Sequence, residues 1–242
     1  MGKIYGYELR RLTLNKLFFG LLVILAVYCW NILTNVTILG TAHTAPFSAW
    51  SFGAYIAGAV PLICIGELLS LTFFASGSPD SVSALTSATP VDARKYLLVR
   101  SGAVLTCSAI MAICALALAF GFYASVFGGA IHIDYGAMIA PALISLPPAL
   151  LFFLGAGWLA AQTRPALVYA LMIPALAMSG LPRGWDPAAG GFFGEYPLTL
   201  GVLDPGFTLP AYALSSRAAY IAAGAAMLLL AMRYARRRSK IT

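Results

Sequence analysis

The chain has 242 residues, of which 61% are hydrophobic and 10% charged, and its mean hydropathy is +0.87. This composition excludes the mixed charged surface of a soluble globular protein, so we expect a protein that lives in the lipid bilayer. The net charge of +7 does not indicate nucleic-acid binding, because the basic residues collect beside the apolar stretches, as in a membrane protein.

The first stretch, residues 1–16, predicts a short interfacial helix that lies along the inner membrane surface. Its apolar side chains recur at roughly helical spacing, at Ile4, Tyr5, Leu9 and Leu12. Glu8 and Arg11 are placed to pair one turn apart. Equally well, residues 1–16 are an ordinary stretch of basic residues beside the first span, which only sets the orientation of the chain in the membrane.

Long stretches without formal charge follow, from Leu17 to Gly66 and from Ser101 to Ile133. Each is longer than the ~20 apolar residues that cross a bilayer as a helix. The chain therefore predicts an all-α membrane protein with six transmembrane helices, at residues 17–39, 52–75, 98–126, 136–162, 165–182 and 215–233. In the last of these, Ala218, Ala222 and Ala226 are spaced as in a face for close helix packing.

The basic residues predict the orientation. If the N-terminus is inside, all of the 15 lysines and arginines except Arg183 and Arg217 are cytoplasmic. We therefore expect a multi-pass protein of the cell (plasma) membrane with both termini in the cytoplasm.

The second span carries one acid, Glu67, and the fourth span carries three prolines. A carboxyl group at membrane depth is costly, so Glu67 is a candidate for a role in transport. It also lies close enough to the cytoplasmic end of its span to pair with Lys16 or Arg100. Pro141, Pro147 and Pro148 predict that the fourth span bends or breaks near its middle.

A polar segment, residues 76–97, connects the second and third spans. It contains two helix-start patterns in tandem, Ser78-Pro79-Asp80 and Thr89-Pro90 with Asp92. They predict one short helix over residues 79–88 and a second that runs from Pro90 into the third span. A cytoplasmic protein has its natural docking place here, on a chain otherwise embedded in lipid.

Two external connections carry polar or aromatic residues. His132 and Asp134, between the third and fourth spans, suggest a proton or metal site, although such a pair in a polar turn is usually just solvated. Residues 183–214, before the last span, are rich in Gly, Pro and aromatic residues. We expect them to form an external re-entrant segment at the membrane interface.

Several catalytic patterns are missing from the sequence. There is no H-E-x-x-H, no G-x-S-x-G, no paired carboxylates within a span and no metal-ligand spacing among the four cysteines. No lysine is followed by the Ser or Thr of a P-loop. We therefore expect a non-catalytic subunit without a cofactor of its own, and any ATP hydrolysis on a separate chain.

Within the polar segment, Leu85-Thr86-Ser87-Ala88-Thr89-Pro90-Val91 is followed by Arg94, Lys95 and Tyr96-Leu97-Leu98. With the six spans, the interfacial helix and the external segment, this pattern resembles the ABC-2 type permease subunits of ATP-binding-cassette exporters. The resemblance implies that residues 79–88 form a coupling helix that docks on a cytoplasmic P-loop ATPase, which holds ATP and Mg. The contact residues implied are Asp80, Ser81, Val82, Ala84, Leu85, Thr86, Thr89 and Pro90.

The resemblance also implies that two permease chains, identical or different, pair with two ATPase subunits to move substrate outward. Two other classes stay open. A gradient-driven carrier would use Glu67, and a non-transporting sensor or immunity subunit would sequester a peptide at residues 183–216. The partners expected are the ATPase, the second permease chain and the lipid bilayer, with no nucleic acid.

Overall fold

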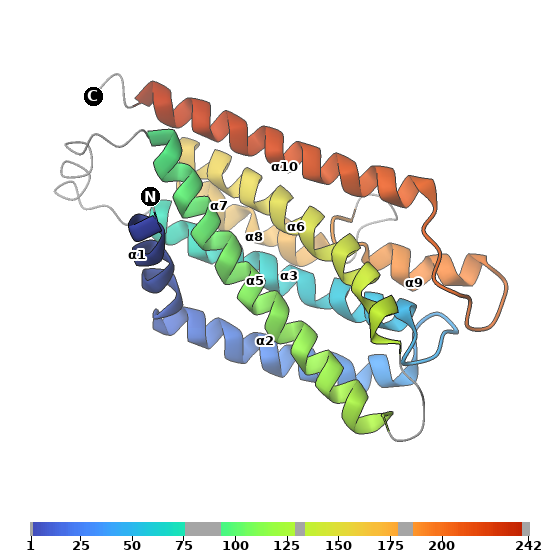
Figure 1. Ribbon diagram of the computed structural model, residues 1–242. Helices are drawn as coiled ribbons and strands as arrows, with labels where there is room; N and C mark the ends of the chain where they lie inside the picture. The colour runs from blue at the N-terminus through green and yellow to red at the C-terminus, as the bar shows by residue number, and fades with distance from the viewer. Residues whose placement is uncertain (1, 76–92, 129–133, 179–185, 239–242) are drawn as a thin grey trace.

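The computed structural model describes residues 2–75, 93–128, 134–178 and 186–238, and every regular element in these ranges is a helix (Figure 1). In chain order the helices are α1 (Gly2–Thr13), α2 (Lys16–Asn35), the short 3-10 helix η1 (Thr37–Leu39), α3 (Ala49–Ala75), α5 (Ala93–Val126), α6 (Tyr135–Thr163), α7 (Ala166–Ala170), α8 (Met172–Ala177), α9 (Gly190–Thr199) and α10 (Ala211–Arg238).

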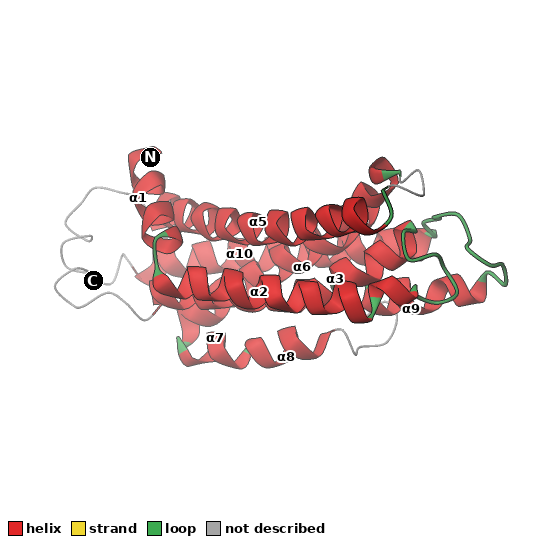
Figure 2. Cartoon of the chain, turned by 90° about the horizontal axis from the view of Figure 1, so that it is seen from below, coloured by secondary structure: helices red, strands yellow, loops and turns green. Residues whose placement is uncertain are grey.

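Five helices of the described residues are long and apolar enough to cross a membrane. They cover Lys16–Leu39, Ala49–Phe74, Arg94–Val126, Tyr135–Thr163 and Ala211–Ala235. These ranges agree with five of the six predicted spans to within a few residues at each end. The long helices run side by side in one bundle (Figures 1 and 2). The chain is therefore an all-helical, multi-pass membrane protein.

The predicted span at residues 165–182 is not one continuous helix. The structure has two short apolar helices here, α7 and α8, separated at Leu171. Pro174 supplies a physical reason, because it has no N–H to donate to the carbonyl of Ala170, where α7 ends. Residues 179–185 lie outside the described ranges, so the structure does not establish a sixth span.

Helix α3 lies at the centre of the bundle and α10 at its edge. In α3, 72% of the residues in the most apolar stretch are buried, against 11% in α10. Among the described elements, α3 contacts α2, α5, α6, α7, α8 and α9. A side chain on α3 is therefore surrounded by protein, whereas most of α10 is exposed in this chain.

Helix α6 continues from Tyr135 to Thr163 with three prolines inside it. The helix therefore does not break at Pro147 and Pro148, and the other form of the prediction, a bend, stays a prediction. Asp134 begins the helix by accepting hydrogen bonds from the N–H groups of Gly136 and Ala137, so it is a helix cap, whereas His132 lies outside the described residues. Helices α3 and α10 pack along α6 and support it where the prolines remove backbone hydrogen bonds.

The α6–α10 contact depends on two glycines. A β-carbon on Gly155 would lie 2.2 Å from the carbonyl oxygen of Gly224, and one on Gly224 would lie 2.3 Å from that of Leu151. The two backbones therefore touch. The sequence predicted a close-packing face from three alanines of the same helix, but these are exposed in this chain: Ala218, Ala222 and Ala226.

The two ends of the bundle differ. Helix α1 lies across the end at which α2 and α5 begin and α3, α6 and α10 finish, as the views in Figures 1 and 2 agree. We call this the α1 end. Helix α9 lies at the opposite end, which we call the α9 end. The chain therefore enters and leaves the bundle at the same end.

Candidate functional site

Helix α1 is attached to the first turns of α5. Its apolar face packs on the bundle through Leu9 and the buried Leu12. The Tyr5 hydroxyl is 2.6 Å from the Thr106 hydroxyl on α5, within hydrogen-bond distance. The helical spacing in the sequence thus predicted the apolar face correctly, and the structure adds that this face is covered by protein.

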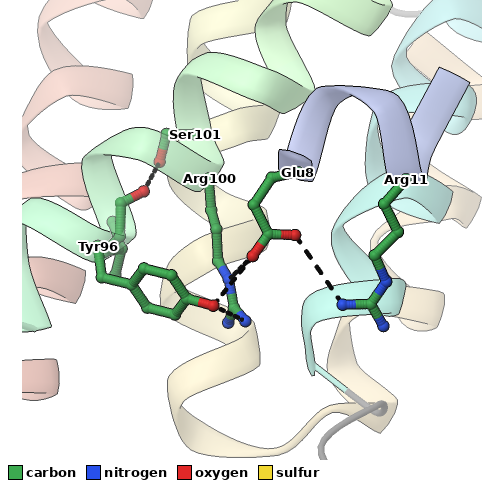
Figure 3. Close-up of polar contacts among 6 residues, drawn as sticks. Glu8, Arg11, Tyr96, Arg100 and Ser101 are labelled. Carbon is green, nitrogen blue, oxygen red and sulfur yellow. Dashed lines mark hydrogen bonds and ion pairs between the residues drawn. The ribbon is translucent and has the colours of Figure 1, made fainter. Parts of the chain in front are cut away.

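A cluster of four polar residues joins α1 to α5, and we call it the clamp: Glu8, Arg11, Tyr96 and Arg100 (Figure 3). The Glu8 side chain is only 2% exposed. Its Oε1 accepts a hydrogen bond of 2.9 Å from the Tyr96 hydroxyl and one of 3.3 Å from Arg100 Nε. Arg100 Nη2 also donates to the Tyr96 hydroxyl oxygen at 2.7 Å, so three groups form a closed triangle.

The Arg100 guanidinium lies between two aromatic rings. Its Cζ is 4.1 Å from the centroid of the Tyr96 ring and 4.9 Å from that of the Phe74 ring, near the end of α3. Such contacts stabilise a cation that has been partly removed from water. Arg100 therefore connects α1, α3 and α5 at one point.

Arg11 contributes less to the clamp. Its Nη1 lies 3.9 Å from Glu8 Oε2, and its side chain is 42% exposed. The sequence predicted this pairing one helical turn apart, and the structure confirms it. An exposed ion pair at this distance is weak, so the Glu8–Arg100 contact carries most of the attachment.

Tyr96 of the clamp belongs to the polar segment, residues 76–97, from which the sequence predicted a coupling helix. All eight predicted contact residues are outside the described ranges: Asp80, Ser81, Val82, Ala84, Leu85, Thr86, Thr89 and Pro90. The structure describes the helices that this segment joins, α3 up to Ala75 and α5 from Ala93. Tyr96 is three residues into α5, about 5 Å along its axis.

Glu67 lies within α3 and is 1% exposed. Neither carboxyl oxygen has a hydrogen-bond partner among the described residues. The predicted pairing with Lys16 or Arg100 is not present among them, and Arg100 binds Glu8 instead. Glu67 is therefore a buried acid without an assigned structural contact, which keeps its possible role in transport open.

A second polar network lies at the α9 end and joins the start of α9 to α10. The buried Asp186 accepts hydrogen bonds through its carboxylate from the N–H groups of Ala188 (2.7 Å), Gly190 and Gly191 (3.3 Å). It thereby satisfies the first N–H groups of α9. Burial raises the pKa of the Asp186 carboxyl, and these backbone donors and Arg217 partly offset the increase.

Arg217 of α10 completes this network. Its side chain is buried, and Nη1 donates to the carbonyl oxygens of Asp186 (2.5 Å) and Pro187 (2.7 Å). From the sequence we expected only an external basic residue at this position. In the structure, Arg217 holds the segment before α9 against α10.

An aromatic cluster lies beside this network and fixes α9 on α3. Trp50 of α3 is 1% exposed and donates through Nε1 to the carbonyl oxygen of Pro205 at 2.9 Å. Four rings lie 4.8 to 6.3 Å from its own, measured between centroids: Phe192, Phe193, Tyr196 and Phe207. These four aromatic residues of the external segment therefore pack on protein.

Sequence reasoning missed the Glu8–Arg100 contact and the Asp186–Arg217 network. The available signal was the scarcity of acids, because the chain has only 8 aspartates and glutamates. A buried carboxylate without a donor is costly, so Glu8 and Asp186 deserved the same search for a partner as Glu67. Among the described residues, no group of three or more metal-ligating side chains occurs.

In comparison with known proteins, no protein-family model matches the chain and no curated protein is significantly similar to it.

Proposed function

We propose that this chain is the membrane-spanning permease subunit of an ATP-driven exporter of the ATP-binding-cassette type. It pairs with a second permease chain and with two cytoplasmic P-loop ATPase subunits, which bind ATP and Mg. Residues 79–88 form the coupling helix. In this proposal the chain crosses the plasma membrane six times, with the fifth crossing made by α7, α8 and the residues that follow, and the α1 end faces the cytoplasm.

One observation carries the proposal. The polar segment that resembles a coupling helix leaves α3 and enters α5 at the α1 end, within two turns of the clamp. A force on this segment would reach α5, and through Glu8 and Arg100 it would reach α1 and α3 as well. An ATPase docked on the segment would therefore move several helices together.

The charges and the exposure of the helices support the same proposal. Lys16, Arg94 and Arg164 flank α2, α5 and α6 at the α1 end, as the positive-inside rule expects for the cytoplasmic side. Helix α10 is mostly unburied within one chain and exposes Ala222 and Ala226, which do not line a cavity of the described residues. Small residues of this spacing let a helix from a second chain approach closely.

The proposal is tested by purifying the full chain from native membranes and identifying the proteins that accompany it. A P-loop ATPase is expected. Leu85→Glu should remove it, because a charge would enter the docking surface, while Leu198→Glu, at an exposed position of α9 at the other end, should not. Recovery of the chain alone, with flux unaffected by ATP depletion, contradicts the proposal.

The orientation has its own test. In intact cells, a membrane-impermeant maleimide should label Leu203→Cys, an 81% exposed position at the α9 end, and should not label Ser87→Cys. Labelling of Ser87→Cys in intact cells would mean that the polar segment lies outside the cell and would contradict the proposal.

A gradient-driven carrier is the second candidate, because Glu67 is buried in α3 without a hydrogen-bond partner among the described residues. Such a carrier requires a group that gains and loses a proton or binds a cation at membrane depth. It predicts flux that follows a pH or sodium gradient and disappears in Glu67→Gln. Unchanged flux in that variant excludes it.

A further inference from the structure

A small cavity lies between α6 and α10, and one buried cation lines it. The cavity has a volume of about 190 Å³. Its lining consists of Arg217 and seven apolar residues, which include Leu143, Pro148, Leu214 and Ala218. Arg217 is 5% exposed, so its guanidinium has exchanged water for an apolar surrounding.

The hydrogen bonds of Arg217 are incomplete. Nη1 makes both of its bonds, to the carbonyl oxygens of Asp186 and Pro187. Nε is buried and has no acceptor among the described residues. Among the described residues Arg217 has no salt bridge: the Asp186 carboxylate binds three backbone N–H groups and acts on Arg217 only through its charge, from beyond ion-pair distance. A buried charged donor without an acceptor is costly, so the site favours an incoming anion.

The cavity opens toward the lipid. Leu143 and Leu214 on its rim are 64% and 63% exposed, and Ile221 is 37% exposed. Arg217 lies six residues after the start of α10, about 9 Å along the helix axis. Arg217 therefore lies near the α9 end of the apolar span Ala211–Ala235. A ligand that enters from the bilayer can therefore present its polar head at Arg217 and its tail at the rim.

We propose that this cavity binds the head of a single-chain anionic lipid, a long-chain carboxylate, with the carboxylate accepting from the Arg217 guanidinium and the tail lying over Leu143 and Leu214. The two oxygens of a carboxylate match the planar fork of a guanidinium. The cavity exceeds the ~30 Å³ of one water several times but is smaller than a typical ligand pocket of ~300 Å³ or more. It therefore takes the head and the first carbons, and the rest of the tail stays in the bilayer.

The chemistry of the cavity distinguishes this ligand from two simpler ones. A free anion such as acetate would satisfy Arg217 but leave the apolar rim without a contact. A neutral long-chain alcohol would cover the rim but leave the guanidinium charge unpaired. The inference uses only α6, α10 and Arg217, so it goes beyond the proposed function and does not depend on an ATPase partner.

The test uses the purified full chain in nanodiscs of zwitterionic lipid, with a palmitic acid analogue that carries a photoreactive diazirine in its tail. Light should attach the probe to peptides of α6 and α10 in a saturable manner. Palmitate should compete, whereas hexadecanol and acetate should not compete at the same concentration. Equal competition by hexadecanol, or effective competition by acetate, would overturn the proposal.

Three variants locate the site. Ala218→Phe fills the cavity and leaves both Arg217 hydrogen bonds in place, so labelling should fall about tenfold or more. Ala219→Phe adds the same ring to the neighbouring exposed position, which does not line the cavity, and should label as the unaltered chain does. Arg217→Gln should also lose about tenfold, the factor for one charge-assisted hydrogen bond. If Arg217→Gln does not fold, the Ala218→Phe and Ala219→Phe pair decides alone, and equal labelling of these two contradicts the proposal.

Discussion

Arg100 and Glu8 lie 92 residues apart in the sequence, yet Arg100 Nε is 3.3 Å from Glu8 Oε1 in a contact that joins α5 to α1. Glu8→Ala leaves the Arg100 guanidinium without its carboxylate. We expect it to lower the free energy of unfolding by about 2–3 kcal/mol. The measurement is the unfolding midpoint of the purified chain in detergent.

Two comparisons show whether the loss of stability comes from the interaction between Glu8 and Arg100. Arg11→Ala removes only the exposed contact at 3.9 Å and should cost about 0.5 kcal/mol or less. In a double-mutant cycle, Glu8→Ala and Arg100→Ala should be non-additive by about 1 kcal/mol or more. Additive losses would mean that the two residues stabilise the chain independently.

Gly155→Ala and Gly224→Ala should each destabilise the chain strongly, because the added methyl group meets backbone atoms 2.2–2.3 Å away. Neither helix can relieve this contact by turning a side chain. We expect a loss of about 2 kcal/mol or more and a lower thermal midpoint. Gly121→Ala in α5 meets nothing within 4 Å and should be neutral or slightly stabilising.

Trp50→Phe should loosen the connection between α9 and α10. The variant keeps a ring in the aromatic cluster but loses the 2.9 Å hydrogen bond to Pro205. The expected loss is about 1 kcal/mol, with faster proteolysis at residues 200–210. Trp30→Phe is a suitable control, because Trp30 lies on α2 and is 53% exposed. Equal proteolysis of the two variants would contradict this role of Trp50.

Asp186 predicts a pH dependence. Because burial raises its pKa in the folded chain above the ordinary value of 3.8, the folded state holds its proton more tightly than the unfolded state does. The stabilisation from this proton is complete below pH 3.8 and is lost as the pH rises through the raised pKa. The thermal midpoint of the unaltered chain relative to Asp186→Asn should therefore fall as the pH rises across this range.

Asp204→Asn is the control for the pH experiment, since Asp204 is an exposed acid at the same end of the bundle. The Asp204 side-chain oxygen accepts a hydrogen bond from Ala45 N–H, which asparagine can also accept, so this variant removes one carboxyl group and keeps the contact. A slope of midpoint against pH that is the same in Asp186→Asn as in the unaltered chain would show that other groups cause it.

Glu67→Gln should not destabilise the chain, because Glu67 makes no hydrogen bond to the described residues that the change could break. Replacement of the buried carboxyl group by an amide of the same shape should leave the thermal midpoint equal or higher. ATP-driven flux should stay within about twofold, whereas a lower midpoint would reveal a partner for the carboxylate. Glu8→Gln is the contrasting variant: Glu8 accepts from the Tyr96 hydroxyl and from Arg100 Nε, so this change should lower the thermal midpoint.

The sequence was sufficient for the long spans and insufficient for the polar contacts. Five spans were predictable because each needs only an apolar run of sufficient length. The Glu8–Arg100 contact was not predictable, because nothing in the local sequence around either residue specifies a partner 92 residues away. Similarly, the alanine pattern of α10 was visible, but the glycine contact depends on which face of α10 meets α6. The break between α7 and α8 at Leu171 was not predicted. The high hydropathy of residues 165–182 indicated one continuous span, although Pro174 disrupts the helix locally.

The three prolines of α6 have a mechanical consequence. Pro141, Pro147 and Pro148 cannot donate to the carbonyl oxygens of Ala137, Leu143 and Ile144, so the middle of the helix lacks three backbone hydrogen bonds although its path is continuous. A helix with fewer such bonds is less stiff there. When the surrounding helices shift, α6 should flex around residues 141–148, while its remaining turns move as a rigid rod.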